Sequence, residues 1–507
     1  RRQYTLFAAQ SQLGAGRMTS LHVGTSGQGK HWTRFLWLLF FTALLHCFFS
    51  LVIPLSEDEA YYWTWAQNFS LSYFDHPPMT AWAIRFSTAI FGDNLFAIRL
   101  PAMFFSSATA LLVAYLSPQP TLAALFLLTP LFLFGGALMT PDLPLVFFWT
   151  LYLTWTSRIH ARLETWNCDP VTRVYHNSPI SPIDWLMGGC VLGLGLLSKY
   201  TMALAVVCSA LTFITRTKTR AWWKGFALHL LVAGLLGLPV LYFNKLHDFL
   251  PFKFQWNHMG GIGAFSWGKF VEFWGVQGLL VGFLPLLFLP RITLVWRYLW
   301  TDPRLQPCVV FFLFPALYFT YKSLTANLEA NWVIVMYLAA WPVMQRICQI
   351  SSFKTWNWIL MLVAFIPAWV CSIALTIHLF APLRFIPPYK DRIRVPQARM
   401  DTAILATEEL KNQPVKAPIF LPNYQWTSLF LFNRADALQL DIGRRSHFTL
   451  SPVDPCQRDA IYYWMAGDNP QVPSELGCFT KRTVVKTYLV TVGGQKVENI
   501  EMVRLEK

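Results

Sequence analysis

The sequence predicts a mainly α-helical protein that crosses a membrane many times and carries a small α+β domain at its C-terminal end. Three observations support this fold class. Hydrophobic residues make up 55% of the 507 residues, charged residues make up only 13%, and the mean hydropathy is +0.39. A soluble chain of this length carries more charge and less apolar surface, so a polytopic membrane protein is indicated.

Successive apolar runs predict the membrane helices, and we expect about 11 to 13 spans in all, in a membrane domain over residues 34–388. Residues 1–33 are polar and are interpreted as a cytoplasmic tail, with Met18 as an alternative start. The predicted helices are 34–55, 95–116, 120–138, 143–158, 183–198, 200–215, 225–243, 269–289, 307–321, 331–347 and 356–380.

The charged residues predict the orientation of the chain. With a cytoplasmic N-terminus, basic residues gather in the inside loops, as the positive-inside rule requires. The inside loops then carry Arg158, Arg162, Arg291, Arg297, Arg304 and Arg346, among others. The remaining polar residues of interest fall on the opposite, periplasmic face, so we expect a site there. The net charge of +15 is accounted for by the basic loops, and nucleic acid is excluded as a partner because no basic patch lies on a soluble fold.

The composition changes after Pro387-Pro388, and residues 389–507 predict a periplasmic α+β domain. Residues 400–411 predict a helix, and 417–421 and 487–492 predict strands. Cys456 and Cys478 lie in this polar segment; outside the cytoplasm they are expected to pair in a disulfide, and inside it to stay free.

Four carboxylates follow the first apolar run closely, and they are the strongest indication of a site. Glu57, Asp58, Glu59 and Asp75 lie in a first periplasmic loop over residues 56–94. Acids at a membrane edge are costly to desolvate and mark sites, so Asp58 and Asp75 are our candidate catalytic residues. Helix capping or a solvated loop is the alternative. Residues 60–71 between them predict an amphipathic helix in the membrane interface.

Other polar residues on the same face have two interpretations each. Asp142 either caps a helix or lines a site. Lys199 either reaches to the membrane surface or meets a lipid phosphate. His258 is a structural residue, a metal ligand beside Asp75 or a phosphate ligand. Glu329, Asn331 and Trp332 either begin a helix or line the site.

Motifs for soluble nucleotides do not occur: the sequence has no P-loop, no dinucleotide-binding fingerprint, no GxSxG and no HExxH. No nucleotide cofactor is therefore expected. An enzyme that faces away from the cytoplasm would need an energised donor that is already in the membrane.

Together these motifs resemble the glycosyltransferase 39/83-like group of GT-C membrane glycosyltransferases. That group includes lipid A aminoarabinose transferase, rhizobial lipopolysaccharide galacturonosyltransferases and protein O-mannosyltransferases. The resemblance covers about residues 34–340 and rests on Asp58-Glu59, Tyr73–Pro78, Thr140-Pro141-Asp142, Ser198-Lys199-Tyr200, Phe254–His258 and Glu329–Trp332. His76 and a short loop between the two acids depart from the aminoarabinose transferase pattern and argue against that sugar.

The resemblance implies roles for these residues. Asp58 is the catalytic base, and Asp75 with His258 holds a divalent metal such as zinc, magnesium or manganese. Lys199, His76 and Tyr62 bind the donor phosphate. The residues expected to bind the remaining substrate are Glu59, Asp142, Glu329, Asn331 and Trp332.

The implied function is transfer of a sugar from polyprenyl (undecaprenyl) phosphate to lipid A or lipopolysaccharide core. The expected place is the periplasmic face of a bacterial inner membrane, among membrane lipids. A protein O-glycosyltransferase that uses the same donor is one alternative. A lipid or sugar transporter is another, although it predicts charges near the bilayer midplane and matching half-repeats, which the sequence lacks.

Overall fold

The computed structural model describes residues 25–166, 180–214, 220–260, 263–350, 354–450, 454–457, 462–466 and 473–507. Most of the predicted tail therefore lies outside the described residues. The mainly α fold with a small C-terminal sheet is confirmed. The helices up to the C-terminal domain are α2 (Thr25–Val52), α3 (Glu57–Gln67), α4 (Met79–Phe91), α5 (Leu95–Leu116), α6 (Pro120–Leu127), α7 (Pro130–Leu133), α8 (Asp142–Trp166), α9 (Pro182–Leu196), α10 (Ala203–Ile214), α11 (Arg220–Leu246), α12 (Leu250–Gly260), α13 (Trp267–Leu280), α14 (Leu284–Thr301), α15 (Gln306–Ser323), α16 (Ile334–Ile350) and α17 (Lys354–Phe380).

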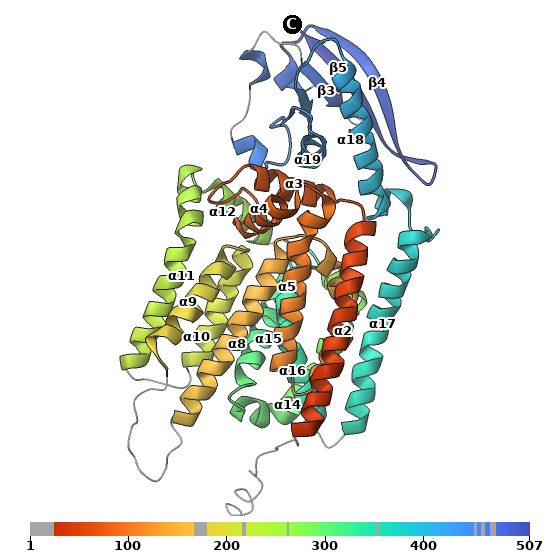
Figure 1. Ribbon diagram of the computed structural model, residues 1–507. Helices are drawn as coiled ribbons and strands as arrows, with labels where there is room; N and C mark the ends of the chain where they lie inside the picture. The colour runs from red at the N-terminus through yellow and green to blue at the C-terminus, as the bar shows by residue number, and fades with distance from the viewer. Residues whose placement is uncertain are drawn as a thin grey trace, which may run out of the picture.

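The long helices form an elongated bundle, with α3, α4 and α12 lying across one end of it (Figure 1). The C-terminal domain sits over that end, so that the short helices lie between the bundle and the sheet. The helices of the bundle drawn side by side in Figure 1 are α2, α5, α8, α9, α10, α11, α14, α15, α16 and α17.

Length and composition identify the membrane-crossing candidates among the described residues. Four helices qualify, Gly29–Val52, Leu95–Leu116, Trp222–Leu246 and Thr355–Phe380, and a bent pair over residues 120–137 makes up to five. The bend of 82° follows from a break before Pro130, whose ring cannot continue the preceding helix. The predicted total of about 11 to 13 spans stays a prediction.

Two predicted helices are wrong as single helices: 120–138 breaks into α6 and α7, and 269–289 breaks into α13 and α14. Gly282 lies at the second break with a φ of +91°, which side chains other than glycine rarely adopt. A Cβ at this position would lie 2.6 Å from the carbonyl oxygen of Ala364 in α17. The break therefore brings the backbone at Gly282 into close contact with the backbone of α17. Hydrophobic periodicity does not reveal such a contact.

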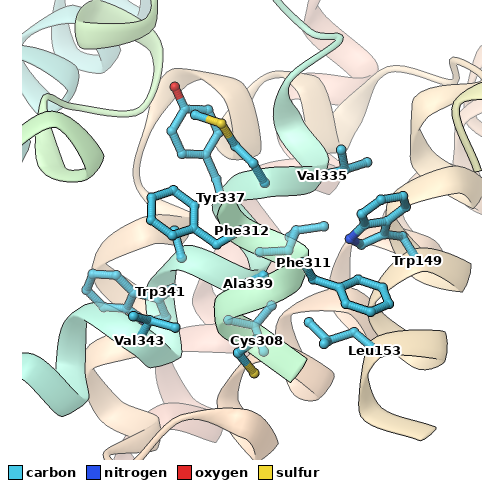
Figure 2. Packing of buried hydrophobic residues seen from close by; sticks show 14 of the residues in the cluster. Trp149, Leu153, Cys308, Phe311, Phe312, Val335, Tyr337, Ala339, Trp341 and Val343 are labelled. Carbon is cyan, nitrogen blue, oxygen red and sulfur yellow. The ribbon is translucent and has the colours of Figure 1, made fainter. Parts of the chain in front are cut away.

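The core of the bundle is packed with aromatic and branched side chains from α8, α15 and α16 (Figure 2). Trp149 and Trp341 are among the largest fully buried side chains, and Trp149 lies edge-on to Phe311 with 5.4 Å between ring centroids. Because this packing is dense, the three helices hold their ends at fixed positions. Those ends carry Asp142 and the segment before α16, which belong to the site described below.

The C-terminal domain contains a five-stranded sheet in the order β2-β1-β3-β5-β4. Strands β1 and β2 are parallel, as are β1 and β3, whereas β5 pairs antiparallel with β3 and β4. Gly493 and Gly494, both with positive φ, connect β4 to β5, which suits a two-residue hairpin turn. The elements are α18 (Arg394–Asn412), β1 (Ile419–Leu421), α19 (Tyr424–Phe432), β2 (Ala437–Gln439), β3 (Tyr462–Ala466), β4 (Lys481–Val492) and β5 (Gln495–Glu506).

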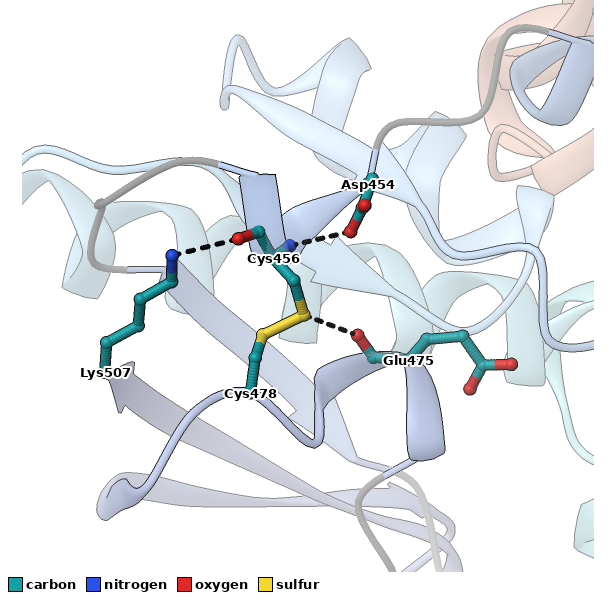
Figure 3. Close-up of a disulfide and its surroundings, with 5 residues drawn as sticks. All are labelled: Asp454, Cys456, Glu475, Cys478 and Lys507. Atoms are coloured by element: carbon teal, nitrogen blue, oxygen red, sulfur yellow. Dashed lines mark hydrogen bonds between the residues drawn. A yellow bond between two sulfur atoms is a disulfide. The ribbon is translucent and has the colours of Figure 1, made fainter.

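The helix and two strands predicted in this domain occur as α18, β1 and β4, although α18 and β4 are longer than predicted. Cys456 and Cys478 form a disulfide, which is the outcome expected for a domain outside the cytoplasm (Figure 3). The Lys507 ammonium donates a hydrogen bond of 2.9 Å to the Cys456 carbonyl, which ties the end of the chain to the same corner. The disulfide joins the segment before β3 to the segment before β4.

Candidate active site

A cavity of about 470 Å³ lies where the end of the bundle meets the C-terminal domain. It combines α3 and the loop after it with α12, the ends of α8, α9 and α15, and three segments of the C-terminal domain. We call it the site pocket. Its lining comprises Glu57, Asp58, Tyr61, Tyr62, Asp75, His76, Thr140, Pro141, Asp142, Lys199, Tyr200, Thr201, Gln255, Glu329, Asn331, Trp332, Arg392, Arg399, Tyr424, Gln425 and Arg444.

Helix α3 places the first acids, and Glu59 anchors that helix. The Ser56 hydroxyl accepts from the Glu59 backbone N–H, while the Glu59 carboxylate accepts from the Ser56 N–H, a reciprocal cap at the helix start. Both side chains of the Glu59–Arg99 ion pair are fully buried, with the closest N–O distance at 2.6 Å. Arg99 also donates to the carbonyl oxygens of Ser50, Ile53 and Pro54.

This arrangement corrects the prediction that Glu59 binds substrate. Glu59 is absent from the lining of the site pocket and is engaged by Arg99, Ser56 and the Met139 N–H. An acid buried against a guanidinium holds α2, α3 and α5 together rather than contacting a ligand. The predicted interfacial helix over residues 60–71 also needs correction. Helix α3 is buried from Glu59 to Ala66, because α4 and α19 pack against it.

The loop before α4 is folded by aromatic side chains. Tyr73 stacks on Trp65 with 4.7 Å between ring centroids, and its hydroxyl donates to the Trp65 carbonyl at 2.9 Å. Phe74 is 1% exposed and packs against Phe254 of α12. Because both rings are fixed in the interior, the next residue, Asp75, is held at a set position on the wall of the pocket.

Asp75 is buried, with two donors on its carboxylate. The Tyr61 hydroxyl donates to Oδ2 at 2.8 Å and the Arg444 guanidinium donates to Oδ1 at 2.7 Å. Burial raises the pKa of Asp75 to about 6, against the opposing effects of the Arg444 charge and the Tyr61 hydrogen bond. Gln255 of α12 donates to the Asp75 carbonyl at 2.7 Å, so three separate segments hold this residue.

Asp58 differs from Asp75 because its carboxylate is open to the pocket. The Tyr424 hydroxyl of α19 donates to Asp58 Oδ1 at 2.9 Å. Asp58 is accessible to water, yet protein surrounds it, and this enclosure raises the pKa of its carboxyl above the usual range, with the Glu57 charge adding to the rise. A carboxylate with a raised pKa that is still reached from the pocket is suited to accept a proton.

Three further lining residues of the site pocket, from distant parts of the chain, meet one another. The Lys199 ammonium lies 2.8 Å from Asp142 Oδ1, and the Asn331 amide donates to Asp142 Oδ2 at 2.6 Å. Asp142 is the first residue of α8, Lys199 lies between α9 and α10, and Asn331 precedes α16. The sequence predicted that all three face one side of the membrane, and the structure brings them into direct contact.

The other predicted residues have different outcomes. His76, Tyr62, Glu329 and Trp332 line the site pocket, as expected for residues near a substrate. His258 belongs to α12, but its side chain lies outside the described residues. The proposed roles of all these residues stay predictions.

The implied metal does not fit the described residues at Asp75. A divalent cation would need the carboxylate oxygen that the Arg444 guanidinium occupies at 2.7 Å. No group of three or more His, Cys, Asp or Glu side chains suited to a metal occurs in the described part of the chain. We therefore derive no step that uses a metal, and the metal stays an untested prediction because the side chain of His258 is not described.

The C-terminal domain supplies pocket residues that the sequence reasoning missed: Arg392, Arg399, Tyr424, Gln425 and Arg444. The Arg444 guanidinium lies over the Tyr424 ring at 4.6 Å and pairs with Asp75, while the Tyr424 hydroxyl donates to Asp58, so the domain contacts both candidate acids through two neighbouring residues. Arg399 pairs with Glu57 at 3.0 Å. The sequence gives one indication of these residues, the adjacent Arg444 and Arg445 after Gly443. No apolar periodicity around them indicates what they contact.

Comparison with known proteins places this geometry in context. The family model described as dolichyl-phosphate-mannose-protein mannosyltransferase matches residues 75–168. A lipid A galacturonosyltransferase from Rhizobium johnstonii is 26% identical over 301 residues, covering 56% of this chain and 58% of the relative. An undecaprenyl phosphate-α-4-amino-4-deoxy-L-arabinose arabinosyl transferase from Sodalis glossinidius is 27% identical over 296 residues, covering 55% of this chain and 51% of the relative.

Solved structures agree on the fold. The crystal structure of ArnT from Cupriavidus metallidurans bound to undecaprenyl phosphate superimposes with a TM-score of 0.55 at 12% identity, over 92% of this chain and 97% of that one. At this identity the match shows the fold alone. The chain spans little more than half the length of the two sequence relatives. The resemblance to the GT-C glycosyltransferase group and the fold that it implies are confirmed.

Proposed function

We propose that this protein is a glycosyltransferase that moves a sugar from a polyprenyl phosphate carrier to lipid A or lipopolysaccharide core. The observation that carries the proposal is the site pocket itself. In it, an accessible carboxylate with a raised pKa, Asp58, lies in the same cavity as the buried Lys199 and several arginines. The named activities of the Rhizobium and Sodalis relatives support this reaction class.

We place the site pocket on the periplasmic face. Basic residues gather at the other end of the bundle, which favours the cytoplasm for that end. The disulfide between Cys456 and Cys478 supports an oxidising compartment for the domain that covers the site pocket. Both arguments are independent of the sequence relatives, and they agree.

The donor carries its sugar on a phosphate, and its charge needs a cationic partner. Lys199 is 8% exposed and paired with Asp142, so its ammonium is held rigidly at the wall of the pocket. We assign it to the phosphate that departs with the polyprenyl chain, where a fixed cation stabilises the growing negative charge. Arg392 also lines the site pocket, and its guanidinium has no ion-pair partner within the described residues, so we assign it to an anionic group of either substrate.

The reaction is a single displacement at the anomeric carbon of the sugar. A hydroxyl oxygen of the acceptor forms the new bond, the bond to the carrier phosphate oxygen breaks, and that phosphate keeps the bonding electrons. Asp58 takes the proton of the attacking hydroxyl, and the Tyr424 hydrogen bond orients the carboxylate for this. Where the acceptor is an ionised phosphate, no proton is removed and Asp58 only positions it.

Asp75 and Arg444 hold the pocket in shape. Because Asp75 is buried and bonded on both oxygens, it has no free position for a substrate proton, so we assign it to positioning. It fixes the α3 loop against the C-terminal domain. The domain thus completes the pocket rather than forming a separate module.

Transfer by the purified full chain tests the proposal directly. The substrates are a polyprenyl phosphate sugar and lipid A, and the product is detected by its mass. We expect Asp58→Asn to lower kcat by at least about a hundredfold with a hydroxyl acceptor while KM for the donor changes little. Full activity of this variant with a hydroxyl acceptor would refute the base role. The absence of transfer by the wild type from any polyprenyl phosphate sugar would refute the reaction class.

A further inference from the structure

A second cavity, of about 650 Å³, lies at the end of the bundle away from the site pocket. Helix α8 relates the two: Asp142 begins it at the site pocket, and Arg158 and Arg162 lie roughly 24 and 30 Å further along at a helical rise of 1.5 Å per residue. That separation matches the hydrocarbon thickness of a bilayer. We call this cavity the arginine pocket, lined by Trp32, Tyr115, Leu116, Ser117, Pro118, Pro120, Thr154, Ser157, Arg158, Ala161, Arg162, Asp302, Arg304, Leu305 and Arg346.

The charges in the arginine pocket are unbalanced. Four arginines line it against a single carboxylate, that of Asp302. Arg162 is neutralised by Asp184 at 2.8 Å, and Arg346 lies 3.9 Å from Asp302. Within the described residues, the guanidinium groups of the other two, Arg158 and Arg304, have no ion-pair partner, so the cavity carries an excess of positive charge that attracts an anion.

Arg346 adds an unsatisfied donor. Its Nε is buried without a hydrogen-bond partner, while its Nη1 donates to the Gln349 side chain at 3.2 Å. A buried donor without an acceptor is costly, and the cost disappears when a ligand supplies an oxygen. Arginine donates along two parallel directions, which match the oxygens of a phosphate group.

Aromatic side chains form part of the lining of the arginine pocket. Trp32 of α2 and Tyr115 of α5 lie on it, and the Tyr115 side chain is 57% exposed on the outside of the bundle. Tryptophan and tyrosine at this depth suit the boundary between headgroups and acyl chains. A ligand with a charged head and an apolar tail fits this arrangement better than a small soluble anion.

We propose that the arginine pocket binds the phosphate headgroup of an anionic membrane lipid. Arg158 and Arg304 carry the charge recognition, and Arg346 supplies a hydrogen bond from within the cavity. The site is separate from the site pocket and does not depend on the function proposed for it. Its occupant would hold together α5, α8, α16 and the connection between α14 and α15.

Native mass spectrometry of the full chain in detergent tests the proposal with three separate probes. These are phosphatidylglycerol, phosphatidylcholine with the same acyl chains, and inorganic phosphate. We expect the wild type to bind phosphatidylglycerol more tightly than phosphatidylcholine. Replacing both unpaired arginines (Arg158→Gln with Arg304→Gln) should weaken phosphatidylglycerol binding roughly 30-fold, because each arginine contributes a headgroup contact, and leave phosphatidylcholine unchanged.

A matched control removes the same charge elsewhere. Lys224 and Arg297 have exposed side chains on α11 and α14 and are absent from the lining of the arginine pocket. Replacing both with glutamine should leave phosphatidylglycerol affinity within about twofold of the wild type. If the glutamine variant of the pocket fails to fold, the lysine pair Arg158→Lys with Arg304→Lys keeps the charge but loses the parallel donors, so phosphatidylglycerol affinity should fall roughly threefold to tenfold, and an unchanged affinity would contradict recognition by these arginines.

Three outcomes would overturn the proposal. The first is equal loss in the pocket and control variants, which would indicate general surface charge. The second is equal affinity of the wild type for the two lipids. The third is inorganic phosphate binding as tightly as phosphatidylglycerol, which would assign the pocket to a soluble anion.

Discussion

Replacing Arg444 with methionine should move the acid limb of the pH–rate profile upward. Asp75, with a pKa of about 6, must be ionised to accept both of its hydrogen bonds, so its titration should contribute to the acid limb beside that of the base Asp58, whose pKa Arg444 also lowers. The Arg444 guanidinium, 2.7 Å away, lowers that pKa. A close opposite charge shifts a pKa by about 1 to 3 units. Because the Arg444 side chain is 42% exposed, we take the lower end, about one unit.

The expected size of the effect follows from this shift. At pH 6 the ionised fraction of Asp75 falls from about one half to about one tenth in R444M, a loss of roughly fivefold beyond any change in the plateau. The assay is the initial rate of sugar transfer between pH 5 and pH 8.5. Arg445→Gln is the control, because this neighbour is 54% exposed and lies 3.9 Å from Asp441 outside the pocket.

The free energy of unfolding should depend on pH in the opposite direction to activity. A loss of activity at low pH can therefore be distinguished from unfolding. Burial raises the folded-state pKa of Asp75 from 3.8 to about 6, so the folded state binds the proton more tightly than the unfolded state. The contribution of Asp75 to the free energy of unfolding is therefore fully present at low pH and decreases as pH rises through 6. Between pH 7 and pH 5 it increases by about 1 kcal/mol. An acid limb that is identical in the two proteins, or one that follows their thermal unfolding, would refute the reasoning.

Three further predictions concern stability and metal dependence. E59Q leaves the buried Arg99 guanidinium without a counter-charge and should lower the free energy of unfolding by about 3 to 5 kcal/mol, or roughly 3 to 5 °C in the thermal midpoint for a chain of this length. Asp184→Asn, at a partly exposed ion pair with Arg162, should cost under about 1 kcal/mol. Equal shifts in the two variants would contradict the role of the buried pair. Replacing Cys456 and Cys478 with serine opens a loop with a sequence separation of 22 residues and should cost about 3 kcal/mol by denaturant unfolding, and an unchanged midpoint would show that this bond contributes nothing. Because a guanidinium occupies the cation position at Asp75, EDTA should leave transfer unchanged, and a loss restored by zinc, magnesium or manganese would reinstate the metal.

Some of this structure could be predicted because local signals are sufficient for it. The helix over residues 95–116 has the bounds that the sequence predicts, since Asn94 caps its start and the run is mainly apolar apart from Arg99 and Pro101 in its first two turns. The sequence predicts that Asp142, Lys199 and Asn331 lie on the same side of the membrane, because topology alone determines that side. Their direct contact depends on how the helices pack and could not be predicted from the sequence.

Other features depend on partners far along the chain. Among Glu57, Asp58 and Glu59, three consecutive acids, only the position of Arg99 decides which one is buried, and no local pattern reveals it. The role of Arg444 requires the C-terminal domain to dock on α3, across more than three hundred residues of sequence. Treating that domain as an addition to the membrane part was the reason its pocket residues were missed.

Mass spectrometry of lipid A and core lipopolysaccharide tests the central claim most directly. The cells compared carry the intact gene, no gene, or an Asp58→Asn copy expressed at the same level. The account predicts that one sugar mass disappears both in the deletion and in the Asp58 variant. A lipid A and core profile that is identical in all three would contradict the proposed acceptor, and a sugar that persists with Asp58→Asn but not in the deletion would remove Asp58 from the reaction.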